Sequence, residues 1–302
     1  MKRIVCLMLA LLVLAALPAI AEGRLKVVAA NFPCYDFARQ VLGENGEVTL
    51  LIHPGVEVHS YEPTPADIIA IGEADLFVYI GGEGDTWAEN ILAGFDGQNA
   101  PASLRMMDAV TPLEEEGEDD HGAHDGPEYD EHIWTSPKNA EAMVAALSDA
   151  LCALDAENAD RYQEAAEAYI DQIKEIDAAF EDAVANGVRR ELVFADRFPF
   201  LYFTRAYGLD YVAAFPSCTA ETEPTPQTML TLIQRVEEDH IPVVYAIELS
   251  TQAVARTVAE ETGAQIMTMH SMQTVSQEEF DAGETWVSLM RRNLEAVRRG
   301  LN

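Results

Sequence analysis

The chain has 302 residues, 49% of them hydrophobic, so it is long and apolar enough to bury the cores of two domains of ordinary size. Its 19 lysines and arginines are outnumbered by 52 aspartates and glutamates, which gives a formal net charge of −33. Because phosphate binding needs a cationic surface, this balance argues against nucleic acid as a partner. The same charge would concentrate cations near the surface, and it also suits plain solubility or a salty habitat.

The N-terminus has the features of a secretory signal. Lys2 and Arg3 precede an apolar run, and residues 19–21 (Ala-Ile-Ala) provide the small residues of a cleavage site, so we expect residues 1–21 to be removed before Glu22. The run could instead stay as a membrane anchor, although no cysteine stands at the cleavage point to carry a lipid. No other stretch approaches the about 20 apolar residues of a membrane span. The protein is therefore expected to be periplasmic or otherwise extracytoplasmic.

Three cysteines would remain after cleavage, namely Cys34, Cys152 and Cys218. An odd number at such wide spacing fits no cysteine-based metal cluster, but it allows one disulfide in an oxidising compartment. Which two would pair is left open. We expect these thiols to be inert or disulfide-bonded and not to bind metal.

The first part of the mature chain alternates between strands and helices. His59 lies in a turn-rich loop, residues 53–63, that follows the second expected strand, and Thr64 caps the helix after it, with Pro65 at a first-turn position. Repeated strand-to-helix order predicts a mostly parallel sheet, with ligands at the carboxyl ends of its strands. The expected strands are 25–30, 48–52 and 75–80, and the expected helices are 33–42, 64–71 and 86–92.

Two helices follow in the middle of the chain, at 137–154 and at about 156–186. The second has few breakers and carries an apolar stripe at helical spacing, and about 29 residues at 1.5 Å each would span roughly 43 Å. We therefore expect a rigid spine helix. After it, strands and helices alternate again: 192–195, 199–207, 209–214, 226–238, 242–247, 251–262, 265–269 and 283–299.

The predicted fold class is α/β, with two lobes of mostly parallel sheets flanked by helices and joined by the long spine helix. The expected division is a signal peptide at 1–21, an N-terminal lobe at 22–155, the spine at 156–186 and a C-terminal lobe at 187–302. A ligand is expected between the lobes.

An acidic segment, residues 114–131, lies within the N-terminal lobe and contains His121 and His124, with His132 directly after it. So many carboxylates cannot be buried in a core, because desolvating them costs more than the few apolar groups return. Imidazole and carboxylate are ligands of divalent transition metals, and short His-rich tracts are typical of metal binding. For His121 and His124, transient metal capture and simple solubility are equally open.

Several pieces of the chain resemble the metal-specific solute-binding proteins of zinc and manganese ABC importers. They are PGVEVHSYEPTP (54–65), DEHIWTSPKNA (130–140), the acidic segment before it, AYGL (206–209) and ETGA (261–264). They cover nearly all of the mature chain in order. In that family the histidines of the first two motifs bind the metal, and here they are His59 and His132. The resemblance implies a carrier that holds a divalent metal between its lobes and delivers it to an ABC permease, not an enzyme.

Two positions depart from the family pattern. Where a third histidine usually follows the first strand of the second lobe, this chain has Arg197, beside Asp196, and an arginine stays protonated and cannot bind a metal. We expect Arg197 to pair with an acid near the site. Where an aspartate usually follows the last strand, this chain has His270. The predicted ligands are therefore His59, His132 and His270, with Asp196, Glu223, Glu248 or water in the fourth place.

Three imidazoles with a carboxylate or water suit tetrahedral Zn²⁺, whereas Mn²⁺ prefers more oxygen donors. Zinc is therefore the expected cargo, with manganese second. Because binding requires neutral imidazole, we expect affinity to fall below about pH 6. The carrier is expected to be a monomer.

The main alternative is a secreted zinc hydrolase, because three protein ligands with an open position is also a catalytic arrangement. The sequence has neither an HExxH helix nor a GxSxG elbow, and the acids nearest the motifs, Glu62 and Glu131, fit loop hydrogen bonding better than a general base. A metal-binding surface adhesin is a third reading. Each histidine also has an ordinary alternative role, hydrogen-bonded to backbone or capping a strand end.

Overall fold

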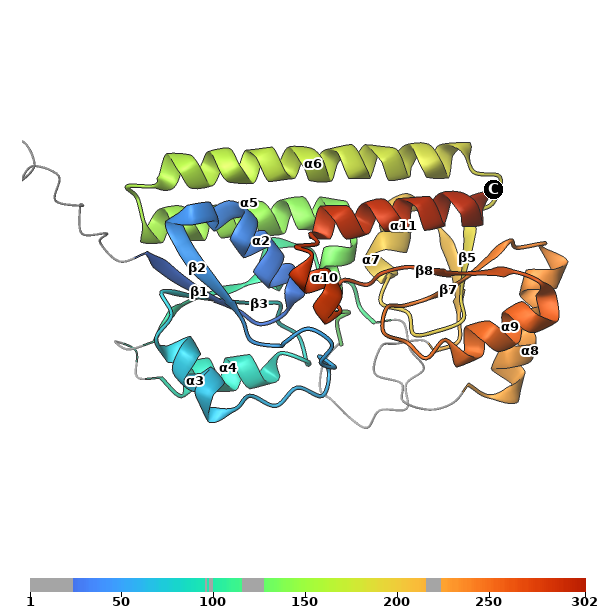
Figure 1. Cartoon of the computed structure of the whole chain (residues 1–302), viewed down its shortest axis with the longest axis horizontal. Coiled ribbons are helices and arrows are strands. Elements are labelled where there is room, and N and C mark those ends of the chain that lie inside the picture. The colour runs from blue at the N-terminus through green and yellow to red at the C-terminus, as the bar shows by residue number, and fades with distance from the viewer. Residues whose placement is uncertain (1–23, 96, 98–99, 116–127, 216–223) are drawn as a thin grey trace, which may run out of the picture.

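The computed structural model describes residues 24–95, 97, 100–115, 128–215 and 224–302. The expected signal peptide, His121, His124, Cys218 and Glu223 lie outside the described residues. Two four-stranded sheets, each with all its strand pairs parallel, form the framework, in the strand orders β2-β1-β3-β4 and β6-β5-β7-β8 (Figure 1). The strands are β1 Leu25–Ala29, β2 Gly46–Leu50, β3 Leu76–Tyr79, β4 Ala102–Arg105, β5 Glu191–Phe194, β6 Asp210–Ala213, β7 Val243–Ala246 and β8 Gln265–Thr268.

The inner strands explain why both sheets need helices on both faces. Every residue of β3 (Leu-Phe-Val-Tyr) and of β7 (Val-Val-Tyr-Ala) is buried, which is the continuous apolar run expected of a parallel strand covered on both sides. Edge strands β2, β4 and β8 are more exposed. The alternation of strand and helix in the sequence therefore gives the predicted α/β class, and that prediction is confirmed.

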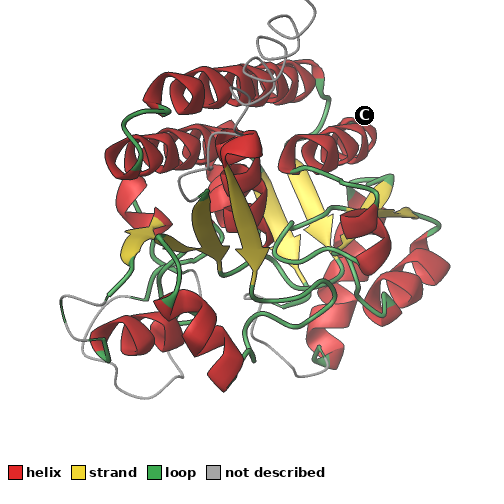
Figure 2. Cartoon of the chain, turned by 60° about the vertical axis from the view of Figure 1, so that its left-hand side comes forward, coloured by secondary structure: helices red, strands yellow, loops and turns green. Residues whose placement is uncertain are grey.

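The helices form one layer shared by both sheets and one separate layer for each sheet. Helices α5, α6 and α11 run along one side of the molecule, whereas α3 and α4 cover the other face of the first sheet and α8 and α9 that of the second (Figures 1 and 2). The helices are α2 Phe32–Leu42, α3 Pro65–Gly72, α4 Thr86–Ala93, α5 Pro137–Leu154, α6 Ala159–Asn186, α7 Leu201–Tyr207, α8 Pro226–Glu238, α9 Ala253–Thr262, α10 Gln277–Asp281 and α11 Trp286–Leu301.

Helix α6 is the expected long helix, 28 residues from Ala159 to Asn186. Its buried face carries the apolar stripe seen in the sequence, from Tyr162 through Tyr169 and Ile173 to Phe180. These side chains belong to one hydrophobic core that contains residues of both sheets, so the two halves share a continuous interior on this side. The division at residues 155 and 187 stays a prediction.

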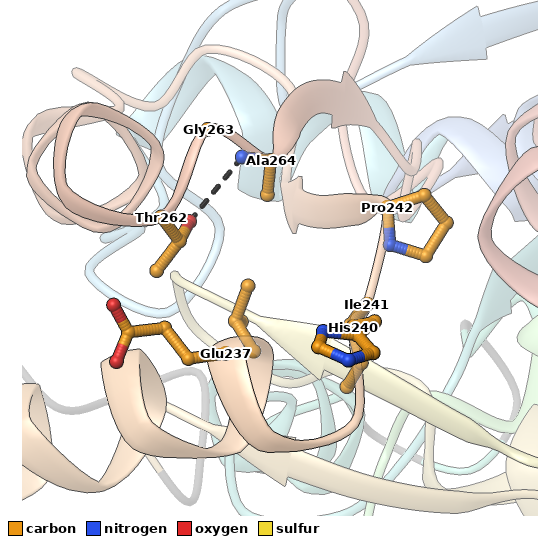
Figure 3. A pocket seen from close by; sticks show the side chains of 8 residues that line it. Glu237, His240, Ile241, Pro242, Thr262, Gly263 and Ala264 are labelled. Atoms are coloured by element: carbon orange, nitrogen blue, oxygen red, sulfur yellow. Dashed lines mark hydrogen bonds between the residues drawn. The ribbon is translucent and has the colours of Figure 1, made fainter.

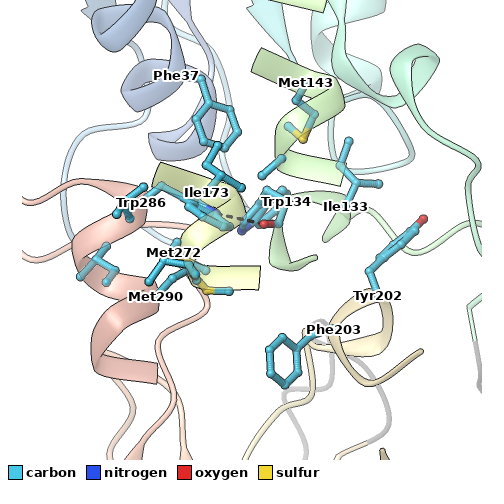
Figure 4. Packing of buried hydrophobic residues seen from close by; sticks show 14 of the residues in the cluster. Phe37, Ile133, Trp134, Met143, Ile173, Tyr202, Phe203, Met272, Trp286 and Met290 are labelled. Carbon is cyan, nitrogen blue, oxygen red and sulfur yellow. Dashed lines mark hydrogen bonds between the residues drawn. The ribbon is translucent and has the colours of Figure 1, made fainter. Parts of the chain in front are cut away.

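A hydrogen-bonded junction of aromatic residues lies within this shared core. The Trp134 indole N–H donates to the Ser271 carbonyl at 2.7 Å, and the Trp286 indole N–H donates to the Trp134 carbonyl at 3.0 Å. Both indoles are buried among apolar side chains that include Phe37 and Met272 (Figure 4). This junction connects the segment before α5 to the segment after β8, and so fixes the relative position of the two segments that carry His132 and His270.

Cys34 is fully buried, Cys152 is partly buried, and both carry free thiols. Within the described part of the chain, no helix combines the length and the apolar character that crossing a bilayer requires.

Candidate metal centre

The residues singled out by the sequence lie in segments that follow strands or lead into helices. His59 lies in the loop between β2 and α3, His132 directly precedes the short 3₁₀ turn Ile133–Thr135, Asp196 follows β5, and His270 follows β8. Segments that leave the carboxyl ends of parallel strands are where α/β sheets bind ligands. The order of elements therefore places His59, Asp196 and His270 after strands, at the expected ends of the two sheets, and His132 at the entry to helix α5.

Loops from the two halves make direct contact beside His59. The Gly55 amide donates to the Val275 carbonyl at 2.8 Å and to the Thr274 hydroxyl at 3.2 Å. Gly55 has φ of +80°, a conformation that glycine adopts without steric cost. The loop that carries His59 is thus held against the segment that follows β8.

His59 and His132 lie side by side, with ring centroids 5.7 Å apart and ring planes inclined at 62°. Imidazoles that share a metal, each with its nitrogen about 2.0–2.1 Å from it, have centroids roughly 5 Å apart. The two histidines that the motifs assigned as ligands are therefore brought together, within a small adjustment of the spacing that a shared ion needs.

Asp130 orients the His132 ring. Its Oδ1 lies 3.1 Å from His132 Nδ1 and also accepts the His132 backbone N–H at 2.8 Å. Both side chains are almost fully buried, at 6% exposure for His132 and 8% for Asp130. A carboxylate on one ring nitrogen fixes the tautomer that leaves Nε2 with the lone pair, which is the usual support for a metal-bound histidine.

The His59 ring contacts a residue that the sequence analysis did not single out. Its Nε2 lies 2.7 Å from Nε2 of Gln273, a buried side chain 7% exposed. Burial, and then the positive charge of a protonated His132, lower the pKa of His59 to about 4. The ring is therefore neutral at physiological pH. Because an amide nitrogen can only donate, the Gln273 contact places the ring proton on Nδ1 and makes Nε2 the acceptor.

Asp196 is 7% exposed, and only one of its oxygens has a hydrogen bond among the described residues: Oδ1 accepts the Arg197 backbone N–H at 2.9 Å. Oδ2 is buried without such a partner. Burying a carboxylate oxygen without a donor is unfavourable, so this atom is suited to a cation.

Arg197 makes the expected pair with an acid. Its Nη1 lies 3.0 Å from Oε2 of Glu57, two residues before His59. Burial by itself would raise the pKa of Glu57, but Arg197 and the nearby His59 together lower it. Arg197 follows β5 and Glu57 follows β2, so the ion pair connects the two halves next to the histidine pair.

His270 is buried at 4% exposure and is held within its own half of the molecule. Its Nδ1 accepts the Met272 backbone N–H at 2.9 Å, and its Nε2 lies 3.6 Å from Oε2 of Glu279. Asn293 binds both the amide and the carbonyl of His270. The described contacts of this ring are therefore with residues 248–279 and not with the pair formed by His59 and His132.

Glu248, another candidate for the fourth place, is also engaged. Its Oε2 accepts the Ser271 backbone N–H at 2.7 Å, and its Oε1 accepts the Ser271 hydroxyl. Among the residues that the structure describes, no three side chains of His, Cys, Asp or Glu converge closely enough to hold a metal ion. The histidine pair therefore needs further donors, and the complete ligand set stays a prediction.

Gln273 and Asp130 are the residues that motif reasoning missed. Each has a sequence signal: Asp130 stands two residues before a motif histidine, and Gln273 is a polar residue in the segment after the last expected strand. Neither signal reveals which way the side chain points.

A separate hollow lies at the far end of the second sheet (Figure 3). His240 is among its lining residues and is exposed. The lining residues are Val236, Glu237, His240, Ile241, Pro242, Thr262, Gly263 and Ala264.

Comparison with known proteins agrees with the resemblance found in the motifs. A family described as the periplasmic component A of the zinc-uptake complex matches residues 27–300. The high-affinity zinc uptake system protein ZnuA of Bacillus subtilis is 30% identical over 283 residues, which cover 92% of this chain and 88% of that protein. The zinc-binding lipoprotein AdcA of Streptococcus pneumoniae is also 30% identical over 283 residues.

That match covers 92% of this chain but 56% of AdcA, so the chain spans about half the length of the first curated relatives that it matches. The Zn(II)-bound ZnuA-like domain of the same AdcA superposes with a TM-score of 0.79 at 28% identity, covering 92% of this chain and 99% of that domain. The laminin-binding protein Lmb of Streptococcus agalactiae, with a TM-score of 0.78 at 23% identity over 92% of this chain and 100% of Lmb, shares the fold. With the family match over residues 27–300 and the likeness to ZnuA, this chain belongs to the family of periplasmic zinc-uptake component A proteins.

Proposed function

We propose that this chain binds a divalent metal outside the cytoplasm, zinc first and manganese second, and delivers it as cargo to the permease of an ABC importer. The observation that carries the proposal is the pair of His59 and His132, with ring centroids 5.7 Å apart and His132 braced by buried Asp130. Imidazole selects transition metals over Mg²⁺ and Ca²⁺, which prefer oxygen. The names of the AdcA and ZnuA relatives as zinc-binding and zinc-uptake proteins support zinc.

His59 and His132 supply the first two donors in this proposal. Asp196 is the first choice for a third, because its buried Oδ2 has no hydrogen-bond donor among the described residues. His270 is the remaining candidate from the sequence, and to bind it would have to give up its contacts with Met272 and Glu279. Binding through His270 would therefore require movement in the segment after β8, and Asp196 would likewise have to approach the histidine pair, because no three such side chains converge in the described structure.

The proposed delivery of the metal to the permease depends on the donors coming from different halves of the chain. His59 and His132 belong to the N-terminal half, whereas Asp196 belongs to the C-terminal half, so a bound ion would stabilise one relative position of the two. A permease that recognises this position distinguishes the loaded carrier from the empty one. The leader expected at residues 1–21 directs the carrier out of the cytoplasm. Outside the cytoplasm the carrier acts as a monomer and catalyses no reaction.

The test is a zinc titration of the mature chain against a chelating dye. We expect one tightly bound ion, and an affinity at least about 100-fold lower in His59→Ala and in His132→Ala, because each substitution removes one of few donors. His53→Ala is the matched control, since His53 lies exposed in the same loop. The zinc-loaded protein is expected to leave ester, phosphate and peptide substrates unchanged.

The acidic segment needs its own control, because His121 and His124 could bind zinc independently of the pair. Replacing both with alanine is expected to leave the single tight ion in place. The proposed site would be overturned if tight zinc binding survives His59→Ala and His132→Ala but is lost when His121 and His124 are replaced. Turnover of a substrate that is abolished by His59→Ala would favour the hydrolase.

A further inference from the structure

The amide of Gln273 occupies the position from which a metal would bind His59. Its nitrogen lies 2.7 Å from His59 Nε2, so it donates to the lone pair that an incoming ion needs. A metal that binds His59 through Nε2 must therefore either displace this amide or include it among its ligands.

Contacts independent of any metal hold Gln273 at this place. Its own backbone N–H donates to the Ser271 hydroxyl at 3.2 Å, and the two residues after it, Thr274 and Val275, both bind the Gly55 amide. Its side chain is 7% exposed. The segment is thus fixed to the His59 loop directly after Gln273 and to its own half directly before it, so displacing Gln273 would mean separating the two halves there.

Turning the amide over is the simpler change. The amide nitrogen and oxygen of a glutamine have nearly the same shape, and a rotation of about 180° about the last side-chain bond exchanges them. The oxygen would then face His59. A nitrogen and an oxygen at about 2.0–2.2 Å from a tetrahedral metal lie about 3.4 Å apart, so the two side chains would also have to separate from the present 2.7 Å by less than about 1 Å. Gln273 can therefore change from a donor to His59 into an oxygen ligand.

We propose that Gln273 is the metal ligand contributed by the segment after β8, in place of His270, and that its amide caps His59 Nε2 until the metal arrives. The inference rests on the proposed function, because it concerns the same site. The resulting donor set has two imidazoles and a neutral amide oxygen, with Asp196 as the acidic donor. Such a set binds a dication less tightly than one with a second carboxylate, so Gln273 determines affinity as well as geometry.

The experiment is a competitive zinc titration of Gln273→Ala and Gln273→Glu beside the unaltered protein. We expect Gln273→Ala to weaken binding about tenfold or more, because an oxygen donor is lost, and Gln273→Glu to strengthen it by a similar factor, because a charged donor replaces a neutral one. Gln277→Ala and Gln277→Glu are matched controls for side chain and charge. Gln277 is exposed, and its amide binds Asp281 within α10.

The sign of the change separates the possible roles. If Gln273→Ala strengthens binding, the amide only competes with the metal, and if it changes nothing, the amide lies outside the site; either result overturns the inference. X-ray absorption at the zinc edge supplies a second readout, with two imidazoles expected in the unaltered protein. A third imidazole that disappears in His270→Asn would show that His270 is the ligand.

The outcomes also separate this inference from the function on which it rests. If the unaltered chain binds no zinc, or binds it without His59 and His132, the proposed function fails and the inference fails with it. If both histidines are required and the Gln273 variants behave like the Gln277 variants, the inference alone fails.

Discussion

At the scale of single residues, burial changes the acid–base behaviour expected of the candidate ligands. The sequence suggested that affinity falls below about pH 6, because free imidazole titrates near there. In the folded chain, burial, and then the positive charge that His132 carries whenever it is protonated, lower the pKa of His59 to about 4. If His59 binds the metal as proposed, proton competition at this ring is expected to begin at a lower pH than the sequence implied.

Asp85 shows the opposite shift. It is 4% exposed, and burial raises its pKa to about 6, although its Oδ2 accepts the Ile80 and Gly81 amides at 2.7 and 3.0 Å, which lower the value. A carboxyl whose pKa is raised by folding favours the folded state below about pH 4, and this contribution is lost as pH rises towards 6. With a pKa of about 6 in place of the usual 3.8, the loss of folding free energy between pH 4 and pH 7 is roughly 3 kcal/mol.

Asp85→Asn should therefore be more stable than the unaltered chain above pH 6 and less dependent on pH between 4 and 6. The amide oxygen can still accept both backbone N–H groups, whereas the buried charge is gone. Urea unfolding at pH 4, 5, 6 and 7 measures the difference, and comparing the two proteins cancels the contributions of all other acids. A constant difference across these pH values would contradict the raised pKa.

At the scale of elements, Asp36 connects three helices in the shared core. This fully buried carboxylate, on α2, accepts the Tyr169 hydroxyl of α6 at 2.6 Å and the Trp286 amide of α11 at 2.7 Å through Oδ2. Its Oδ1 pairs with Arg39 at 2.8 Å. The charge is therefore compensated, and the helices that support the two sheets are fixed relative to one another.

Asp36→Ala should destabilise the chain by about 3–5 kcal/mol, because it leaves a buried hydroxyl and a buried N–H without an acceptor and removes the partner of Arg39. Thermal unfolding followed by circular dichroism measures the loss. The control is Asp171→Ala, because Asp171 is exposed on α6 and its ion pair with Lys174 is 3.8 Å long. Equal melting temperatures for the two variants would show that the contacts of Asp36 with Tyr169, Trp286 and Arg39 contribute no stability.

At the scale of the whole molecule, a metal held by donors from both halves should stabilise the complete fold. A ligand at 100 times its dissociation constant adds about 2.7 kcal/mol, and for a chain of this size we expect the melting temperature to rise by roughly 5 °C. Differential scanning calorimetry with zinc, and then with a chelator that reverses the effect, measures this rise. His132→Ala should abolish it, and His53→Ala should not.

The contrary result has a clear physical meaning. If one zinc ion binds but the melting temperature stays the same, the unfolded chain binds the ion equally well, as a local cluster such as the acidic segment could. The donors would then come from neighbouring residues and not from segments that only folding brings together.

The sequence by itself determined the local features of this protein. The alternation of apolar strands with helices gave the α/β class, and the stripe from Tyr162 to Phe180 gave the long helix α6. Two contiguous motifs singled out His59 and His132, whose rings lie side by side in the structure, while their role as ligands stays a prediction. Each of these depends on spacing within a short stretch, which the printed sequence displays directly. Helix ends were less accurate: the last helix starts at Trp286 and not at 283, because Thr285 provides the cap.

Only the tertiary structure decided how distant segments meet. Gln273 and His59 are 214 residues apart, yet their side chains are in contact, whereas the His270 ring, only three residues before Gln273, is directed to Met272 and Glu279. Asp130, which looks like one more acid in an acidic segment, is buried against His132. The shared core holds the two sheets in one relative position, and this position decides whether a polar loop side chain faces the candidate site or packs within its own half. No local pattern in the chain encodes that position.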